Sequence, residues 1–425
     1  MPVQTAIQHR RGAAATWTST NPTLAAGEIG FETDTGKFKI GTGSTAWNSL
    51  SYFNPGAVAS PLTTKGDLWT YSTTDARLAA GSNGDTLVAD SAATVGLRYS
   101  GGVGLTNPVI NGGFDIWQRG TSFSFNNNTA YTADRWACVV PNTGATISRQ
   151  TTGDTTNLPF IQYCARLARN SGTTNTGTLG ITQSFETTNS LFYAGKTVTM
   201  SFYARAGANF SASGSSIVVY LITGTGTDQN HTVGGYTGQA TPINTTATLT
   251  TTWQRFSFTG TIAATATEIA VNTGYTPVGT AGAADYYEIT GWQIDVGNTA
   301  LPFRRSGGTI QGELAACQRY YWRAGGDGTY TNYGWARGIG TTTVRASIQC
   351  PVQMRVAPTA VEFSNLGVGD MVSVSSAITG LTLSEAGKYV TLLEGTGATG
   401  LTAGTIYAFR SNNSSSGYVA LSAEL

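Results

Sequence analysis

Three aromatic residues in the last third of the sequence, Tyr330, Tyr333 and Trp335, are the first candidates for a binding site. An aromatic ring packs against the C–H groups of a sugar, and a neighbouring Asp or Asn hydrogen-bonds its hydroxyl groups. Recognition residues usually lie in loops on a rigid β scaffold, so this stretch predicts a glycan-binding site. Packing of these aromatic residues in the C-terminal core or along a trimer axis is the favoured interpretation, and recognition is the functional one. Tyr236 and Tyr275, in Gly/Thr-rich stretches further upstream, are second candidates.

Catalytic chemistry has few candidate residues, because the chain contains only two histidines, His9 and His231. A hydrolytic triad needs a histidine that an acid holds against a nucleophile. Only His231 could serve, and a loop histidine is the favoured interpretation. A glycosidase needs two carboxylates facing the sugar, and only 23 Asp and Glu residues are spread over 425 positions. We therefore expect a protein that is not an enzyme.

The cysteines do not suggest a metal centre. Cys138, Cys164, Cys317 and Cys350 form no Cys-x-x-Cys pair, and a zinc site normally needs closely spaced Cys or His pairs. We expect four buried free thiols.

The composition predicts an all-β protein. Charged residues make up 11% of the chain, against roughly a quarter in an average domain, and Lys and Glu, which usually cover helix surfaces, are scarce. Thr, Val, Tyr and Trp between Gly-rich turns suit strands. The net charge of +1, without a basic run, argues against nucleic acid. No apolar stretch is long enough to span a bilayer, and the start lacks the apolar centre of a signal peptide.

The order of these patterns divides the chain into four parts. Residues 1–56 and 57–104 are small β modules, each too short to bury a core alone. Residues 105–308 hold alternating strands and form a jelly-roll sandwich, and residues 309–425 form a smaller C-terminal β-sandwich after a helical turn at 309–320. The strands expected in the two larger parts span residues 196–205, 217–222, 253–258, 286–296, 342–348, 359–363, 371–374, 389–393, 405–409 and 418–421.

The first module carries a specific motif. The sequence RRG at residues 10–12, LAAGEIGFETD at 24–34, KIGTG at 39–43 and TAW at 45–47 resembles the N-terminal module of phage tropism determinants and phage tail fibres. The resemblance implies an intertwined homotrimeric β-prism that attaches the protein to a baseplate or tail protein. Residues 63–67 and 85–90 resemble a connector of phage tail proteins.

The third part also carries motifs of its own. NGGFDIWQRG at residues 111–120, YTADRW at 131–136, GWQIDVG at 291–297 and CQRYY at 317–321 are similar to carbohydrate-binding-like jelly rolls of phage tail fibres. In such domains two acidic residues at the positions of Asp115 and Asp295 can share a structural Ca²⁺, although surface or capping carboxylates are the favoured interpretation. Trp117, Trp136 and Trp292 are expected in the core.

These observations predict a homotrimeric virion tail fibre or receptor-binding protein that attaches to host-surface polysaccharide. It would be assembled in the host cytoplasm, without membrane insertion and with no cofactor other than structural calcium. A purely architectural tail or baseplate component is the main alternative, and a glycan-degrading tailspike is the third.

Overall fold

The computed structural model describes residues 8–53, 60–81, 85–91, 93–100, 107–140, 144–158, 160–326, 328–370 and 375–425. Contacts divide the chain into two compact units, one of residues up to 81 together with 89–98, and one of residues 82–88 together with 99–425. Strands are the main regular structure of both units, so the expected all-β fold class is confirmed.

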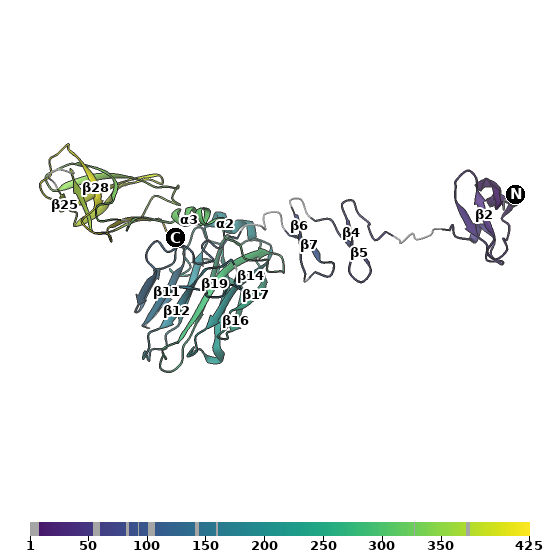
Figure 1. Ribbon diagram of the computed structural model, residues 1–425, viewed down its shortest axis with the longest axis horizontal. Helices are drawn as coiled ribbons and strands as arrows, with labels where there is room; N and C mark the ends of the chain where they lie inside the picture. Colours follow the sequence, from purple (N-terminus) through teal and green to yellow (C-terminus); the bar gives the residue numbers. More distant parts are fainter. Residues whose placement is uncertain are drawn as a thin grey trace, which may run out of the picture. The chain divides into compact units, whose positions relative to one another are not determined.

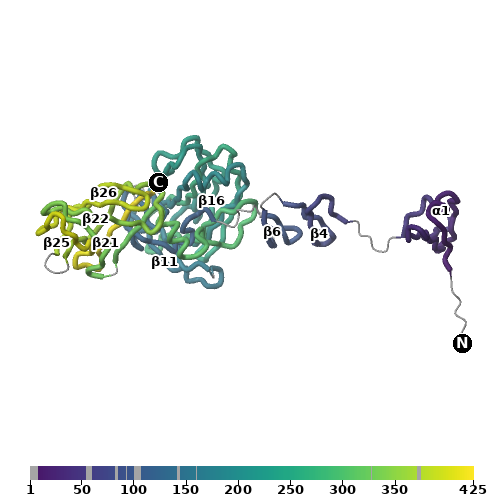
Figure 2. Tube along the Cα trace, turned by 90° about the horizontal axis from the view of Figure 1, so that it is seen from above, coloured from purple at the N-terminus to yellow at the C-terminus, as the bar shows by residue number. Residues whose placement is uncertain are grey.

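A small three-stranded sheet with one short helix forms the N-terminal module (Figures 1 and 2). Its elements are β1 (Arg10–Gly12), α1 (Ala14–Thr20), β2 (Ile29–Glu32), β3 (Phe38–Ile40) and the 3-10 turn η1 (Trp47–Ser49). The sheet order is β1–β2–β3, with β1 parallel to β2 and β3 antiparallel to it. The sequence does not predict α1, because AATWTST lacks the charged residues that normally cover a helix.

One face of this sheet carries a small core. Trp17, Leu24 and Trp47 are buried together, and the two indole rings stack with centroids 4.1 Å apart. Gly30 on β2 permits this packing, because a Cβ at that position would lie 2.5 Å from the Trp47 ring. The helix and the 3-10 turn therefore cover this face.

The opposite face of the same sheet is apolar and open. The register pairs Ile29 with Ile40 and Phe31 with Phe38. Phe53, which is 44% exposed, stacks on Phe38 at 4.9 Å. A cavity of about 470 Å³ borders this face and is lined by Gln8, His9, Arg11, Ile29, Phe31 and Phe38.

Two short hairpins follow the N-terminal module. Their strands are β4 (Leu68–Tyr71), β5 (Asp75–Leu78), β6 (Thr86–Ala89) and β7 (Leu97–Ser100), paired as β4–β5 and β6–β7. Asp67 closes the first turn by accepting hydrogen bonds from the Thr63 and Thr64 amides and from Arg77. Trp69 and Tyr71 remain 47% and 68% exposed. A two-stranded hairpin of this kind has little independent stability in water.

The middle of the chain is a sandwich of two six-stranded antiparallel sheets (Figure 1). The β14–β19 sheet has the order β17–β14–β19–β12–β11–β8, and the β15–β18 sheet has the order β16–β15–β18–β13–β10–β9. The strands are β8 (Ser122–Phe125), β9 (Asn128–Tyr131), β10 (Ala137–Val140), β11 (Ala145–Thr151), β12 (Tyr163–Arg169), β13 (Leu179–Ser184), β14 (Thr197–Ala206), β15 (Ser216–Gly224), β16 (Ala240–Thr248), β17 (Gln254–Thr261), β18 (Glu268–Tyr275) and β19 (Tyr286–Val296). Short helical segments are α2 (Thr187–Ser190), η2 (Leu191–Tyr193) and η3 (Ser213–Ser215).

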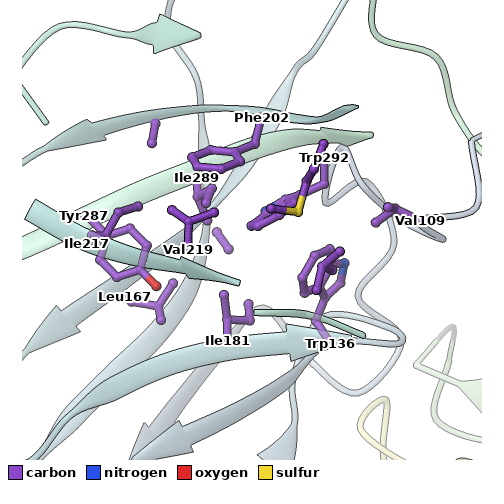
Figure 3. Packing of buried hydrophobic residues seen from close by; sticks show 14 of the residues in the cluster. Val109, Trp136, Leu167, Ile181, Phe202, Ile217, Val219, Tyr287, Ile289 and Trp292 are labelled. Atoms are coloured by element: carbon purple, nitrogen blue, oxygen red, sulfur yellow. The ribbon is translucent and has the colours of Figure 1, made fainter. Parts of the chain in front are cut away.

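The core lies between these two sheets, as Figure 3 shows. Trp292 on β19 packs against Trp136 and Phe202, with ring centroids 5.6 and 4.6 Å apart. Trp117, Trp136 and Trp292 are all buried, which confirms the expectation that these tryptophans are core residues.

The remaining residues form a helix and a second β domain. Helix α3 (Ile310–Gln318) begins at Thr309, whose side chain accepts a hydrogen bond from the Gly312 amide, and it occupies the position of the expected helical turn. A three-stranded sheet has the order β20–β29–β23 and a seven-stranded sheet the order β25–β24–β28–β21–β22–β27–β26. Their strands are β20 (Tyr321–Gly325), β21 (Asn332–Gly338), β22 (Thr343–Gln349), β23 (Ala360–Ser364), β24 (Leu366–Gly369), β25 (Ser375–Ala377), β26 (Gly380–Ala386), β27 (Val390–Thr396), β28 (Ile406–Ser411) and β29 (Tyr418–Ser422). The strand expected at 371–374 lies outside the described residues.

Polar contacts join the sandwich to the C-terminal domain within the second unit. Arg135 is 1% exposed, pairs with the Glu424 carboxylate and stacks 3.6 Å from the Tyr320 ring centroid. Arg319 donates two hydrogen bonds to Glu186, of 2.8 and 2.9 Å. The last residues of the chain are therefore held at a buried junction.

All four cysteines are buried and free, as expected. Among the described residues, no helix is long and apolar enough to cross a membrane.

Candidate functional site

A groove on the outer face of the β15–β18 sheet is a candidate binding site of the sandwich. Its volume is about 390 Å³. Four neighbouring strands and the loop after β15 line it, with the residues Val139, Thr178, Gly180, Val218, Tyr220, His231, Thr232, Asn272, Gly274 and Thr276.

The floor of the groove is a row of paired residues that crosses four strands. Val139 on β10 pairs with Gly180 on β13, Gly180 pairs with Gly274 on β18, and Gly274 pairs with Val218 on β15. The two central positions have no side chain, so the floor is low in the middle. The strands also require glycine there, because a Cβ on Gly274 would lie 2.5 Å from the Leu179 carbonyl oxygen.

Polar side chains of the strands lie along the edges of this floor. Asn272 and Tyr220 are direct cross-strand partners on β18 and β15, and both are half-buried. Neither side chain is engaged in a hydrogen bond within the described part of the chain. At the other edge, the exposed hydroxyl groups of Thr178 and Thr276 lie 2.9 Å apart. The groove therefore presents amide, phenol and hydroxyl groups above an apolar floor.

His231 forms one end of the groove. Its backbone amide donates to the Ser184 hydroxyl, and its ring contacts the Tyr236 ring edge-to-face at 5.4 Å. Burial lowers the pKa of His231, so the imidazole is neutral at pH 7 and can both donate and accept a hydrogen bond. Its Nδ1 atom is buried and has no hydrogen-bond partner among the residues that the structure describes.

The lining supplies groups for binding sugar hydroxyls but not for acid–base hydrolysis. No Asp or Glu is among the described residues that line the groove, and none of them hydrogen-bonds His231. The arrangement that a hydrolytic triad needs is thus absent from this described surface. The aliphatic floor and the Tyr220 ring can pack against sugar C–H groups, while Asn272 and the threonines pair with hydroxyls.

The structure divides the aromatic residues proposed from the sequence into exposed and packed ones. Tyr330 and Trp335 are 48% and 57% exposed. Tyr333 lies against the core of the C-terminal domain, where its hydroxyl donates to the Gly417 carbonyl at 2.7 Å and its ring meets Phe409. The packing alternative therefore holds for Tyr333, and only the other two can present a ring to a ligand.

The two second candidates are not available to a ligand, which corrects the expectation for them. Tyr275 is 1% exposed and packs between the sheets against Phe210 and Tyr287. Tyr236 is 6% exposed, and its hydroxyl donates to the Ile269 carbonyl at 3.0 Å. The burial of Tyr275 and Tyr236 follows from the size of the ring, because a large aromatic side chain near a sheet is more stable buried than exposed.

The two carboxylates proposed for calcium each have an arginine partner. Asp115 accepts hydrogen bonds of 2.8 and 3.2 Å from Arg305, and Asp295 accepts one of 2.7 Å from Arg304. A guanidinium beside each carboxylate supplies the positive charge that a calcium ion would bring. The favoured interpretation from the sequence is surface or capping carboxylates, but Asp295 is 1% exposed and the Asp115 side chain 6%, so neither is a surface carboxylate. Among the described residues, no group of three or more His, Cys, Asp or Glu is arranged to hold a metal.

The sequence analysis did not identify the groove, although two signals point to it. Glycine inside a strand, as at Gly180 and Gly274, often marks a close approach of backbone or ligand. Val218 and Tyr220 alternate with buried residues in β15, which places both on the outer face. Only the register across β10, β13, β18 and β15 shows that these residues lie in one row.

Comparison with known proteins gives one family match. Residues 7–45 match the major tropism determinant N-terminal domain, which confirms the resemblance found in the first module. No curated protein matches the chain.

Three solved structures that resemble the chain each cover less than half of it. The CBM4 structure is 21% identical and covers 44% of this chain and 98% of its own, with a TM-score of 0.26. A xylan-binding domain from CBM 22 is 14% identical, and the match covers 43% of this chain and 99% of that domain, with a TM-score of 0.27. The enzymatically active domain of tailspike protein 4 from bacteriophage CBA120 is 12% identical and covers 45% of this chain and 21% of its own, with a TM-score of 0.30.

Proposed function

We propose that this chain is a homotrimeric receptor-binding protein of a phage tail fibre, which binds host-surface glycan through the groove of its sandwich without cleaving it. The observation that carries the proposal is the groove itself. It joins an apolar floor to the Asn272 amide, the Tyr220 phenol and the exposed hydroxyls of Thr178 and Thr276, on a chain whose first module matches a phage tropism domain.

The chemistry of the lining favours a neutral saccharide. The groove offers the neutral imidazole of His231 and uncharged side chains, with no Lys or Arg for an acidic group. Because the lining also has no carboxylate, the groove fits binding and not hydrolysis. Affinity at one such groove would be weak, and three copies on one fibre raise it through effective concentration.

The N-terminal module supports trimer formation and attachment. Its open face, formed by Ile29, Phe31, Phe38, Ile40 and Phe53, is an apolar patch of the kind that marks an interaction site. Two further copies of the chain would cover this face, and the module would join the fibre to a baseplate or tail protein in the virion. Assembly would take place in the host cytoplasm.

Binding of the full-length protein to soluble neutral polysaccharides, measured by affinity electrophoresis, tests the groove. Asn272→Ala and Tyr220→Ala should each weaken binding by about tenfold, the effect of losing one well-placed polar or aromatic contact. Asn244→Ala is the matched control. Asn244, on β16, is exposed and is the cross-strand partner of Tyr220, but it does not line the groove.

Three outcomes decide the proposal. Retention of the wild type and the control but not of the groove variants supports it. Equal retention of all variants places recognition elsewhere, and no retention on any neutral polysaccharide favours the architectural alternative. New reducing ends in the polysaccharide after incubation would show that the protein is an enzyme.

A further inference from the structure

We infer that the outer face of the seven-stranded sheet in the C-terminal domain binds an acidic saccharide, with Trp335 as the platform for a sugar ring and arginines as partners of its carboxylate. This inference goes beyond the proposed function, because it places a second ligand site of different charge in another domain.

The strand register defines this face. In β21 the buried residues Ala336 and Gly338 point inward, so Trp335 and Arg337 point outward. Trp335 pairs with Ala408 on β28, and Arg337 pairs with Ile406. Directly paired residues of antiparallel strands share a face, so this outer face continues across β28.

The indole of Trp335 is exposed, and its neighbours on the adjacent strands are small. Trp335 is 57% exposed, whereas its partner Ala408 is 2% exposed. The next strand brings Gly369 opposite Ala408. Ala408 and Gly369 are both buried, so the exposed group at this position is the indole itself. An aromatic residue held in this way is typical of a sugar platform.

Positive charge is concentrated around the indole. Strands β28, β21 and β22 contain the arginines Arg337, Arg345 and Arg410 and no Asp or Glu. Arg337 and Arg345 are direct cross-strand partners. Like charges in this position destabilise a sheet, so the pair has a cost for folding that a bound anion would remove.

Only one of these arginines is paired with an acid. Arg345 pairs with its partner on β27, Glu394, at 2.9 Å. Arg337 is exposed and has no ion pair among the residues that the structure describes. It is two residues from Trp335, about 7 Å along the strand, which is within reach of one sugar residue. A guanidinium binds a carboxylate through two parallel hydrogen bonds, so Arg337 is the expected partner of the acid.

The third arginine is held in place by its neighbours. The Arg410 guanidinium lies 4.7 Å from the Tyr330 ring centroid, and it donates to the Ser375 hydroxyl at 3.3 Å. Arg410 follows Ile406 and Ala408 at two-residue spacing on β28, so it lies on the same face. Tyr330, selected from the sequence as a ligand contact, therefore acts as a support for this arginine.

The charge distribution selects the ligand. A neutral glycan would use the indole and leave the arginines unpaired, whereas a carboxylate-bearing sugar uses both. Further copies of the chain on the same face would bring like charges together, so we assign the face to an acidic saccharide and not to subunit contact.

The probe is polygalacturonate, with its fully methyl-esterified form as the uncharged control on the same backbone. Wild-type full-length protein should bind the acid form at least about tenfold more tightly than the ester, and the difference should decrease with added salt. Arg337→Gln should abolish the preference for the acid, and Trp335→Ala should weaken binding of the acid form by about tenfold.

Tyr389→Ala is the matched control. Tyr389 is 58% exposed in the same domain, but the alternation in β27 places it off this face. Asn244→Ala, which lies outside the groove and outside this face, should also leave acid binding unchanged. Loss of neutral-polysaccharide binding in Asn272→Ala and loss of the acid preference in Arg337→Gln are separate readouts, so failure of the groove and failure of this face give different results.

Two outcomes would overturn the inference. Equal affinity of the wild type for the acid and the ester would remove the role of the arginines. A lower molecular mass of Trp335→Ala in light scattering, with its unfolding midpoint unchanged, would show that the face is a subunit contact.

Discussion

Replacing Glu424 by Gln tests how the C-terminal residues hold the sandwich and the C-terminal domain together. The Glu424 carboxylate lies between two arginines, Arg135 and Arg119. The side chains of Glu424 and Arg135 are only 6% and 1% exposed. The amide of Gln has nearly the same shape as the carboxylate but no charge, so the substitution changes the ion pair and not the packing.

The expected effect follows from the burial of the arginine that remains. An arginine cannot lose its proton in a protein, so the Arg135 charge stays buried without an acid. Removing one partner of a buried pair typically costs about 3–5 kcal/mol. Arg135 keeps its hydrogen bond of 2.6 Å to the Ser184 carbonyl and its contact with Tyr320, so we expect the lower end, about 3 kcal/mol.

Urea denaturation followed by tryptophan fluorescence measures this cost. With a slope of about 3 kcal/mol per M, a loss of about 3 kcal/mol lowers the midpoint by about 1 M. Glu394→Gln is the control, because Glu394 also pairs with an arginine, Arg345, but these two side chains are 33% and 41% exposed. An exposed pair contributes about 0–1 kcal/mol. A midpoint of Glu424→Gln that equals that of the control would refute the buried junction.

Two further predictions concern pH and assembly. Burial raises the pKa of Asp134 to about 6, against about 3.9 in the unfolded chain. Between pH 4 and 6 the folded chain therefore binds more protons than the unfolded chain. The free energy of unfolding decreases as the pH rises through that window. Asp134→Asn should remove about 3 kcal/mol from the pH dependence of stability, so that the urea midpoint changes less between pH 4 and 6 than in the wild type. Parallel plots of midpoint against pH for the variant and the wild type would contradict this. Phe38→Asp should convert the proposed trimer to a monomer, as measured by light scattering. Ser19→Asp, on the exposed side of α1, should leave the trimer intact. A stable monomer of the wild type would refute the trimer.

Several features of this protein are determined by its sequence. The scarcity of Lys and Glu and the abundance of Thr and Gly predict strands, because these compositions suit pleated surfaces and tight turns. Period-two alternation predicts β14 and β17, since alternation reports which side chains a sheet buries. The motif in residues 24–34 was sufficient to identify the N-terminal module, which the family match confirms. The three tryptophans of the sandwich motifs are core residues, as predicted from their place in those motifs.

Other features are decided only by the tertiary structure. The sequence places Tyr275 and Trp335 equally well in loops or strands, but their exposure depends on which partner strands and loops cover them. The groove needs residues from β10, β13, β15 and β18 in one row, and the register that aligns them is set by pairing between distant segments. Asp115 and Asp295 resemble cation ligands in the sequence, yet folding brings an arginine to each. Periodicity specifies the face on which a side chain lies, whereas its neighbours across strands depend on long-range pairing that no local pattern contains.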